Sequence, residues 1–123
     1  MANRAPFTTT HTGHAAESAA CRHLEDQGLT LLGRNYRSPF GEIDLIMRDD
    51  ISLVFVEVRQ RRSEQFGTPA ETVDARKQAK LRATAEYYLQ RHPQESQKPC
   101  RFDILAITDD ARGQRIEWLR DAF

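Results

Sequence analysis

Apolar positions in the first half of the chain follow two different periods. Between residues 12 and 27 they recur every three or four positions, which predicts a helix that ends at Gly28. Glu17 lies at the edge of the apolar stripe of this helix. The stripe consists of Ala16, Ala20, Cys21 and Leu24. Residues 29–36 form a shorter apolar segment, and we predict a strand there.

A β-hairpin is predicted next, because Asp49 and Asp50 supply a turn between two apolar segments, residues 41–48 and 52–61. The second segment is apolar from Leu53 to Val58, with Glu57 as its exception. Such a run is typical of a central strand that is buried on both faces. The pattern therefore places an acid in the middle of the sheet.

The second half is predicted to contain one helix and two strands. The segment Thr68-Pro69-Ala70-Glu71 has the form of a capping box for a helix that extends to about Gln90, and Asp74 is an alternative N-cap. The apolar stripe of this helix consists of Leu81, Ala85, Tyr88 and Leu89. Residues 101–108 are predicted as a strand, and residues 114–123 as a last strand or a strand and a turn.

This order of elements predicts a single α/β domain with a mixed central β-sheet flanked by helices. A chain of 123 residues fits one domain. Residues 1–12 lack the apolar stretch of about 7–15 residues that a secretory signal needs, so we expect a flexible N-terminal lead-in before a domain of residues 13–123. No apolar run approaches the roughly 20 residues that span a bilayer, and we expect a cytoplasmic protein without a membrane span.

Charge does not by itself indicate a nucleic-acid-binding protein, because 18 basic residues balance 18 acidic ones. The basic residues nevertheless form local clusters, which either are solvated faces balanced by nearby acids or bind phosphate. The candidates for nucleic-acid contacts are Arg34, Arg37, Arg61, Arg62, Lys77 and Lys80. Trp118 and the three tyrosines do not line up in the sequence as a platform for stacking bases.

Asp44 and Glu57 are the candidate chemical groups, because acids within apolar strands are costly unless they are paired or bind a metal. Strand alternation puts both on one face if residue 48 pairs with residue 51 or 53. Adjacent carboxylates repel each other, and a cation such as Mg²⁺ would remove that cost. The alternative is a pair of structural salt bridges, for example Glu57 with Arg34 or Arg37 and Asp44 with an arginine across the hairpin.

The spacing of these acids resembles the PD-(D/E)xK nuclease motif, since twelve residues separate Asp44 from Glu57-Val58-Arg59. A wider set of segments resembles the YraN-type family of uncharacterised bacterial proteins, which is similar in turn to archaeal Holliday-junction resolvases. The segments, besides Glu17, are RNYRSPFGEIDLI, FVEVRQRRS, FGTPAETVDARKQAKL, RFDILAI and IEWLRDAF. The resemblance covers residues 13–123 and implies a restriction-endonuclease-like fold.

The resemblance also implies roles for single residues. Asp44 and Glu57 would be ligands of Mg²⁺ or Mn²⁺, the Val58 carbonyl would contribute, and Glu17 would match the helix-borne acid of resolvase-like members. Arg59 departs from the motif, which has lysine there. Arginine keeps the charge but has a planar donor fork and stays protonated, so it binds phosphate better than it activates water. Arg61, Lys77 and Lys80 are candidate substitutes, although nothing in the sequence places them at the site.

The leading functional hypothesis is a metal-dependent endonuclease that acts on structured or branched DNA, with Asp44, Glu57, Arg59 and Glu17 as catalytic residues. The alternative is a catalytically impaired DNA- or protein-binding module that retains the nuclease fold. A third hypothesis is a structural adaptor that has buried salt bridges in place of a metal site. By analogy with resolvases, which address paired strands, a homodimer is expected.

Overall fold

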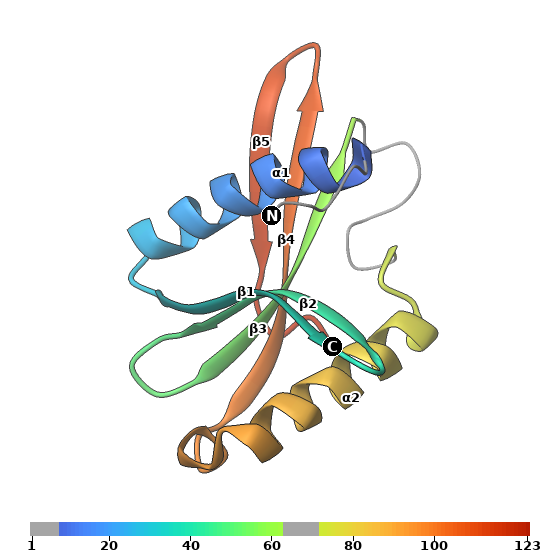
Figure 1. Ribbon diagram of the computed structural model, residues 1–123. Coiled ribbons are helices and arrows are strands. Elements are labelled where there is room, and N and C mark those ends of the chain that lie inside the picture. Colours follow the sequence, from blue (N-terminus) through green and yellow to red (C-terminus); the bar gives the residue numbers. More distant parts are fainter. Residues whose placement is uncertain (1–7, 63–71) are drawn as a thin grey trace.

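The computed structural model describes the backbone of residues 8–62 and 72–123 and the side chains of residues 13–62 and 72–123. Its elements are shown in Figure 1. They are α1 (Thr8–Asp26), β1 (Thr30–Ser38), β2 (Gly41–Arg48), β3 (Leu53–Arg61), α2 (Ala75–Arg91), the 3₁₀ helix η2 (Pro93–Glu95), β4 (Cys100–Asp110) and β5 (Gly113–Leu119).

The five strands of this part of the chain form one mixed sheet in the order β1-β2-β3-β4-β5. β3 and β4 are parallel, and the other neighbouring pairs are antiparallel. The two helices pack on different faces of the sheet, α1 on one and α2 on the other (Figure 1). The structure therefore confirms a single α/β domain in which a mixed sheet is flanked by helices.

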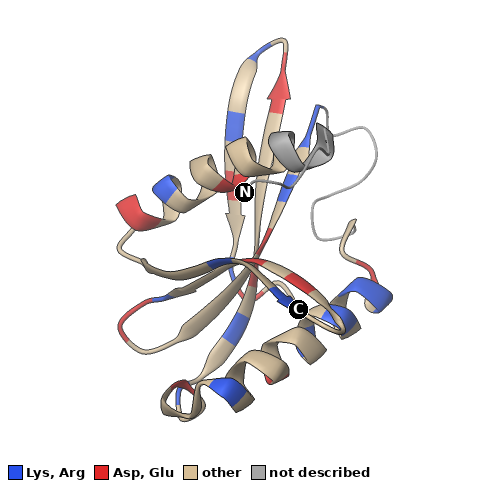
Figure 2. Cartoon of the chain, in the orientation of Figure 1, with Lys and Arg blue, Asp and Glu red and all other residues tan. Residues whose placement is uncertain are grey.

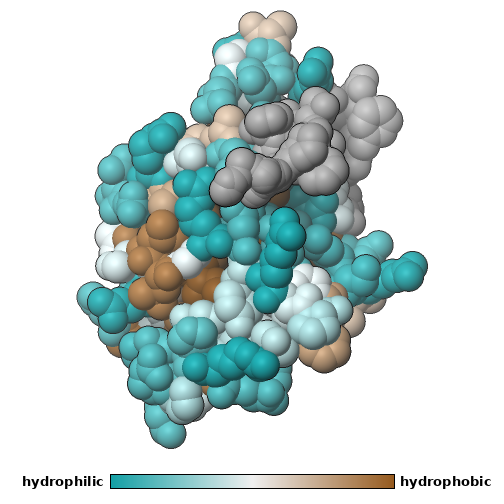
Figure 3. Space-filling model, in the orientation of Figure 1, coloured by the Kyte–Doolittle hydropathy of each residue, from teal (hydrophilic) through white to brown (hydrophobic). Residues whose placement is uncertain are grey.

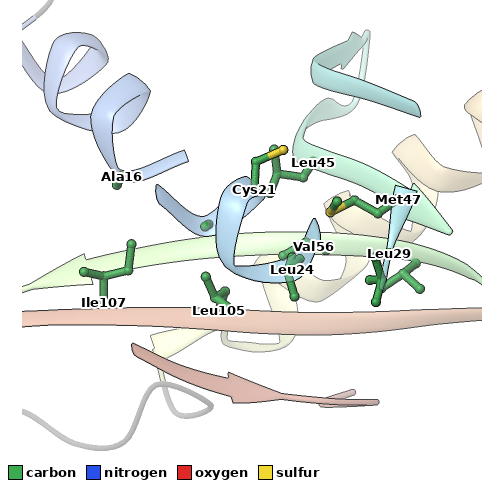
Figure 4. Packing of buried hydrophobic residues seen from close by; sticks show 11 residues of the cluster. Ala16, Cys21, Leu24, Leu29, Leu45, Met47, Val56, Leu105 and Ile107 are labelled. Atoms are coloured by element: carbon green, nitrogen blue, oxygen red, sulfur yellow. The ribbon is translucent and has the colours of Figure 1, made fainter. Parts of the chain in front are cut away.

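The core beneath α1 contains the predicted stripe of that helix. Its buried side chains pack against every second residue of the central strands, as strand alternation requires (Figure 4). From the helix come Ala16, Ala20, Cys21 and Leu24, and from the sheet Leu45, Met47, Val54, Val56, Leu105 and Ile107. The opposite face of the same strands forms a second core beneath α2, where Leu81, Ala85 and Tyr88 are buried as predicted.

The β2–β3 hairpin has one of the two predicted registers, since Arg48 pairs with Leu53. Backbone pairing between these strands ends at Leu45 and Val56, whereas β3 stays paired with β4 up to Arg61. The β1–β2 hairpin thus curves away from the second half of β3 (Figure 1). We call the point where β2 leaves β3 the fork.

Two boundaries differ from the predicted ones. α1 begins at Thr8, before the expected start at residue 12, so residues 8–12 of the predicted lead-in are helical. The four threonines of this segment are weak helix formers, as is Gly13 directly after it, which is why the pattern alone did not extend the helix. Residues 1–7 lie outside the described residues.

α2 begins at Ala75, and Asp74, the alternative predicted cap, is its N-cap. The Asp74 Oδ1 atom accepts a hydrogen bond from the Lys77 N–H at 2.9 Å. The predicted capping box at residues 68–71 lies outside the described residues. Neither described helix has the length and hydropathy needed to cross a membrane. The face in Figure 3 is mostly hydrophilic, with a compact apolar area near the C-terminal half of α1.

Leu105→Ala should lower the free energy of unfolding by about 2–5 kcal/mol, because Leu105 is fully buried beneath α1 and its removal leaves a cavity. Urea denaturation followed by circular dichroism measures this loss. Leu32→Ala is the control, since Leu32 is 37% exposed and should cost less than about 1 kcal/mol. Equal losses in the two variants would contradict the assignment of this core.

Candidate functional site

The Asp44 side chain connects β2 to β3 at the fork. Its Oδ2 atom accepts a hydrogen bond from the backbone N–H of Val58 at 2.8 Å. β2 no longer pairs with β3 at this position, so the Val58 N–H would otherwise lack its partner from that strand. A side-chain oxygen replaces a backbone carbonyl, and the carboxylate is thereby fixed in the opening between the strands.

Glu57, on β3, lies beside Asp44 of β2 and is only 6% exposed. Its Oε2 atom is 3.4 Å from Arg59 Nε and 3.6 Å from Lys77 Nζ. Its Oε1 atom is buried and has no hydrogen-bond partner among the described residues, and the same holds for Arg59 Nε. One oxygen of Glu57 is therefore held by two cations, while Oε1 accepts no hydrogen bond from a described donor. Asp44 is the acid beside it, and the two carboxyl groups share a hydrogen bond when one of them is protonated.

Glu17 brings a third acid from α1. It is 8% exposed, and its Oε1 atom lies 3.8 Å from Arg34 Nη2, which is longer than a hydrogen bond. This Oε1 atom too is buried without a hydrogen-bond partner among the described residues. The acids of α1, β2 and β3 thus converge at the fork, where Figure 2 shows acidic positions next to basic ones.

Burial shifts the titration of all three acids upward. The pKa of Glu57 is raised to about 7 by burial and by repulsion from the charge of Asp44. Lys77 and Arg59 act in the opposite direction. The pKa of Glu17 is also raised to about 7, first by burial and then by the Asp44 charge. Burial raises the pKa of Asp44 itself, against the backbone hydrogen bond that it accepts. Ionising all three acids concentrates negative charge that a cation would neutralise.

Another buried acid, Asp103 on β4, provides an internal comparison. Both of its oxygens accept hydrogen bonds from the Arg101 guanidinium at 3.1 and 3.2 Å. The indole N–H of Trp118 donates to Oδ2 at 2.8 Å, and the backbone N–H of Asp121 donates to Oδ1 at 2.9 Å. This acid has the complete set of partners expected of a structural salt bridge, which the acids at the fork lack.

The donor set fits Mg²⁺ or Mn²⁺. In the described part of the chain, no three His, Cys, Asp or Glu side chains lie close enough together to hold a metal ion. Mg²⁺ needs fewer protein ligands, because one or two carboxylates suffice when water and substrate phosphate complete the shell. Asp44 and Glu57 offer such a pair, and Glu57 Oε1 is the unpaired buried oxygen that a cation would satisfy.

The structure brings some of the predicted site residues together and separates others. Lys77 reaches Glu57 from the first turn of α2, which the sequence did not indicate. Arg34, on β1, donates a hydrogen bond from its guanidinium to the Ser18 hydroxyl of α1 at 3.2 Å. Arg37 forms an ion pair with Glu42.

The other predicted contacts lie farther along these elements. Arg61 and Arg62 line a cavity of about 470 Å³ with Gln60, Asp109 and Asp110. Lys80 is exposed on α2, one turn after Lys77. Glu57 forms ion pairs, as the alternative expected, but with Arg59 and Lys77. The example partners, Arg34 and Arg37, pair with Glu17 and Glu42. The Tyr36 ring of β1 contacts both Tyr87 and Tyr88 of α2, with 6.4 and 5.1 Å between the ring centroids.

Comparison with known proteins gives one consistent family. Residues 16–107 match the model of the uncharacterised protein family UPF0102. A UPF0102 protein of Nitrosococcus oceani is 49% identical over 96% of this chain and 95% of its own length. A UPF0102 protein of Nitrosomonas europaea is 51% identical over 90% of this chain and 92% of its own. One from Stutzerimonas stutzeri is 46% identical over 91% and 93%.

The raised pKa values predict a stability that falls as the pH rises. The folded protein binds protons at Glu17 and Glu57 up to about pH 7, whereas an unfolded glutamate releases them near 4.5. The free energy of unfolding should therefore decrease between pH 5 and pH 8 in metal-free buffer, by about 1–3 kcal/mol per acid. Urea denaturation at pH 5, 6, 7 and 8, at constant ionic strength, measures this slope.

Glu57→Gln should make the slope shallower, because the substituted side chain no longer titrates. Glu117→Gln is the matched control, since this glutamate is exposed on β5 and should leave the slope as in the wild type. A wild-type stability that stays constant or increases between pH 5 and pH 8 would contradict the raised pKa values of these acids. A Glu57→Gln variant with the full slope would contradict the raised pKa of Glu57.

Proposed function

The chain belongs to the uncharacterised protein family UPF0102, and from the geometry of the fork we propose that it is a metal-dependent endonuclease that hydrolyses phosphodiester bonds in structured or branched DNA. One observation carries this proposal. Glu57 has one oxygen beside two cations and one buried oxygen without a partner, next to a second carboxylate that is fixed by the backbone. A purely structural acid would be fully paired, as Asp103 is.

We further propose that the fold is restriction-endonuclease-like. The mixed sheet with a parallel central pair, and a fork that carries acids from adjacent strands, are what support this assignment. In the proposed site, Asp44 and Glu57 hold Mg²⁺ or Mn²⁺, with the Val58 carbonyl as a further ligand. A bound cation supplies Lewis-acid chemistry, since it stabilises charge on phosphodiester oxygens and makes water more acidic.

The chain's own residues prepare this site. Asp44 keeps its carboxylate in place because the Val58 N–H holds one oxygen. Arg59 fixes Glu57 and offers its guanidinium to a phosphate, for which its planar fork is well suited. Glu17 adds a third acid whose raised pKa lets it take up or release a proton near neutral pH.

Lys77 supplies the ammonium that position 59 lacks. It approaches the same Glu57 oxygen as Arg59, so the two cations divide the work that one lysine performs in the motif. In this division Arg59 binds phosphate, while the compact ammonium of Lys77 orients the attacking water or stabilises charge on phosphorus. Lys80, Arg61 and Arg62 extend the basic surface for the DNA backbone. The homodimer and the cytoplasmic location stay predictions.

A second candidate function is supported by Arg59 itself. If Lys77 only neutralises Glu57, the site binds a cation and DNA without cleaving, and the protein is a DNA- or protein-binding module with a nuclease fold. Binding and cleavage must therefore be measured separately.

The proposed activity is tested with fluorescent four-way junctions, flapped duplexes, plain duplexes and single strands, in Mg²⁺ or Mn²⁺. We expect cleavage of the branched substrates and at least about a 100-fold loss in Asp44→Asn and Glu57→Gln. Glu117→Gln, purified in parallel, should cleave like the wild type. Cleavage that persists in both site variants would exclude the fork as the active site. Binding without cleavage by the wild type would favour the binding module.

A second test separates Lys77 from Arg59. Lys77→Met should slow single-turnover cleavage by about 10- to 1,000-fold, whereas Arg59→Lys should keep or increase the rate, because it restores the lysine of the motif. Lys98→Met is the control, since Lys98 pairs with Glu95 far from the fork. DNA affinity without divalent metal is measured alongside. An Lys77→Met variant that cleaves at the wild-type rate would remove Lys77 from the mechanism.

A further inference from the structure

Phe40 is an unusual side chain on this surface. It is 54% exposed at the tip of the β1–β2 hairpin, although an aromatic ring of this size is normally buried. The tip is held firmly in place. The Ser38 hydroxyl accepts a hydrogen bond from the Phe40 N–H at 3.0 Å and shares another with the Thr84 hydroxyl of α2 at 2.9 Å. The exposed ring is therefore presented from a fixed position.

Aromatic and basic groups continue from Phe40 onto α2. The ring of Phe40 meets that of Tyr87 edge to face, with 6.3 Å between their centroids. The guanidinium of Arg91 lies 3.8 Å from the centre of the Tyr87 ring, and the Tyr36 ring lies 6.4 Å from it, measured between centroids. Of the three rings, Phe40 is exposed, whereas Tyr36 and Tyr87 are half-buried.

The same face of α2 leads to the fork. Lys77, Lys80, Thr84, Tyr87 and Arg91 follow one another at spacings of three and four residues, which places them along one side of the helix. The β1–β2 tip rests on this side, since a Cβ on Gly41 would lie 3.5 Å from Lys80 Cβ. Figure 2 shows this tip beside the basic positions of α2.

The distance along this face suits a nucleic-acid strand. Ten residues of helix from Lys77 to Tyr87 rise by about 15 Å, which is the length of roughly four stacked nucleotides. The charges on this face also suit a nucleic-acid strand, because Lys80 and Arg91 are exposed cations. Glu42, an acid on the neighbouring hairpin, is paired with Arg37. An apolar protein partner would find a single exposed ring among these cations.

We propose that Phe40, backed by Tyr87, is a stacking site for an unpaired base, and that Lys80 and Arg91 bind the adjacent phosphates. The inference rests on the proposed function in that both take nucleic acid as the ligand. It adds a preference, because a base within a duplex cannot present its face to Phe40, whereas a flap or an open junction can. The site would thereby select DNA with unpaired nucleotides about four positions away from the phosphate that lies at the fork between β2 and β3.

The test measures binding without cleavage, by fluorescence anisotropy in EDTA, of a duplex with a four-nucleotide flap and of the same duplex without it. Phe40→Ala should weaken binding of the flapped DNA by at least about 5-fold and change duplex binding by less than about 2-fold. Phe40→Trp should retain flap binding, because indole stacks as well. Ile51→Ala is the matched control, since Ile51 is 72% exposed at the tip of the other hairpin. Thermal denaturation confirms that each variant is folded.

The outcomes distinguish this inference from the proposed function. If the wild type binds DNA and Phe40→Ala binds the flapped substrate equally well, the stacking site is wrong while the nuclease proposal stands. If Phe40→Ala weakens flap and duplex alike, the ring contributes no selectivity, which also overturns the inference. If the wild type binds neither DNA, both proposals fail. Quenching of a 2-aminopurine in the flap by the wild type, and its loss in Phe40→Ala, would place the base on the ring.

Discussion

The hydrogen bond between the Asp44 carboxylate and the Val58 N–H determines how the rest of the site is built. A sheet can divide only if the backbone groups released by the division find other partners. Asp44 provides one from its side chain, so β2 can leave β3 while β3 continues along β4. The acid that permits the fork is then held inside it. Its charge acts directly on Glu57 and Glu17, which face the same opening from β3 and α1.

This arrangement explains how a chain without net charge can present a strong local field. Eighteen acids and eighteen bases cancel in the sum, but the fork collects three acids, of which Glu17 and Glu57 are buried and Asp44 is half-buried. The cations around it do not neutralise them all, since Arg34 and Arg59 stand at 3.8 and 3.4 Å and leave buried oxygens without hydrogen bonds. Folding keeps these groups in an unfavourable state, which is typical of a site that binds an ion or substrate.

Sequence reasoning predicted what depends on local pattern. Period and alternation gave the two helices, the five strands and the shared face of Asp44 and Glu57, because the turn after Arg48 restricts the hairpin to a few registers. It missed what depends on packing between distant segments. Lys77 reaches Glu57 only because α2 docks with its first turn at the fork, and the tyrosines meet because β1 and α2 cross. Asp74 was a usable signal, since choosing it as the cap puts Lys77 in the first turn.

The position of Lys77 on a helix has a consequence that a strand lysine would not have. A side chain two residues after Glu57 is fixed by the sheet, as Arg59 is, whatever happens on the sheet's surface. Lys77 instead depends on how α2 packs, and therefore on Leu81, Ala85 and Tyr88 in the core below it. The Asp74 cap fixes the backbone of the first turn, so the Lys77 side chain moves together with α2 when the helix shifts. The charge next to Glu57 is thus coupled to the same helix that carries Lys80, Tyr87 and Arg91. A nucleic-acid strand bound along α2, as proposed, would therefore change the position of the Lys77 charge beside Glu57 without contacting the acids at the fork.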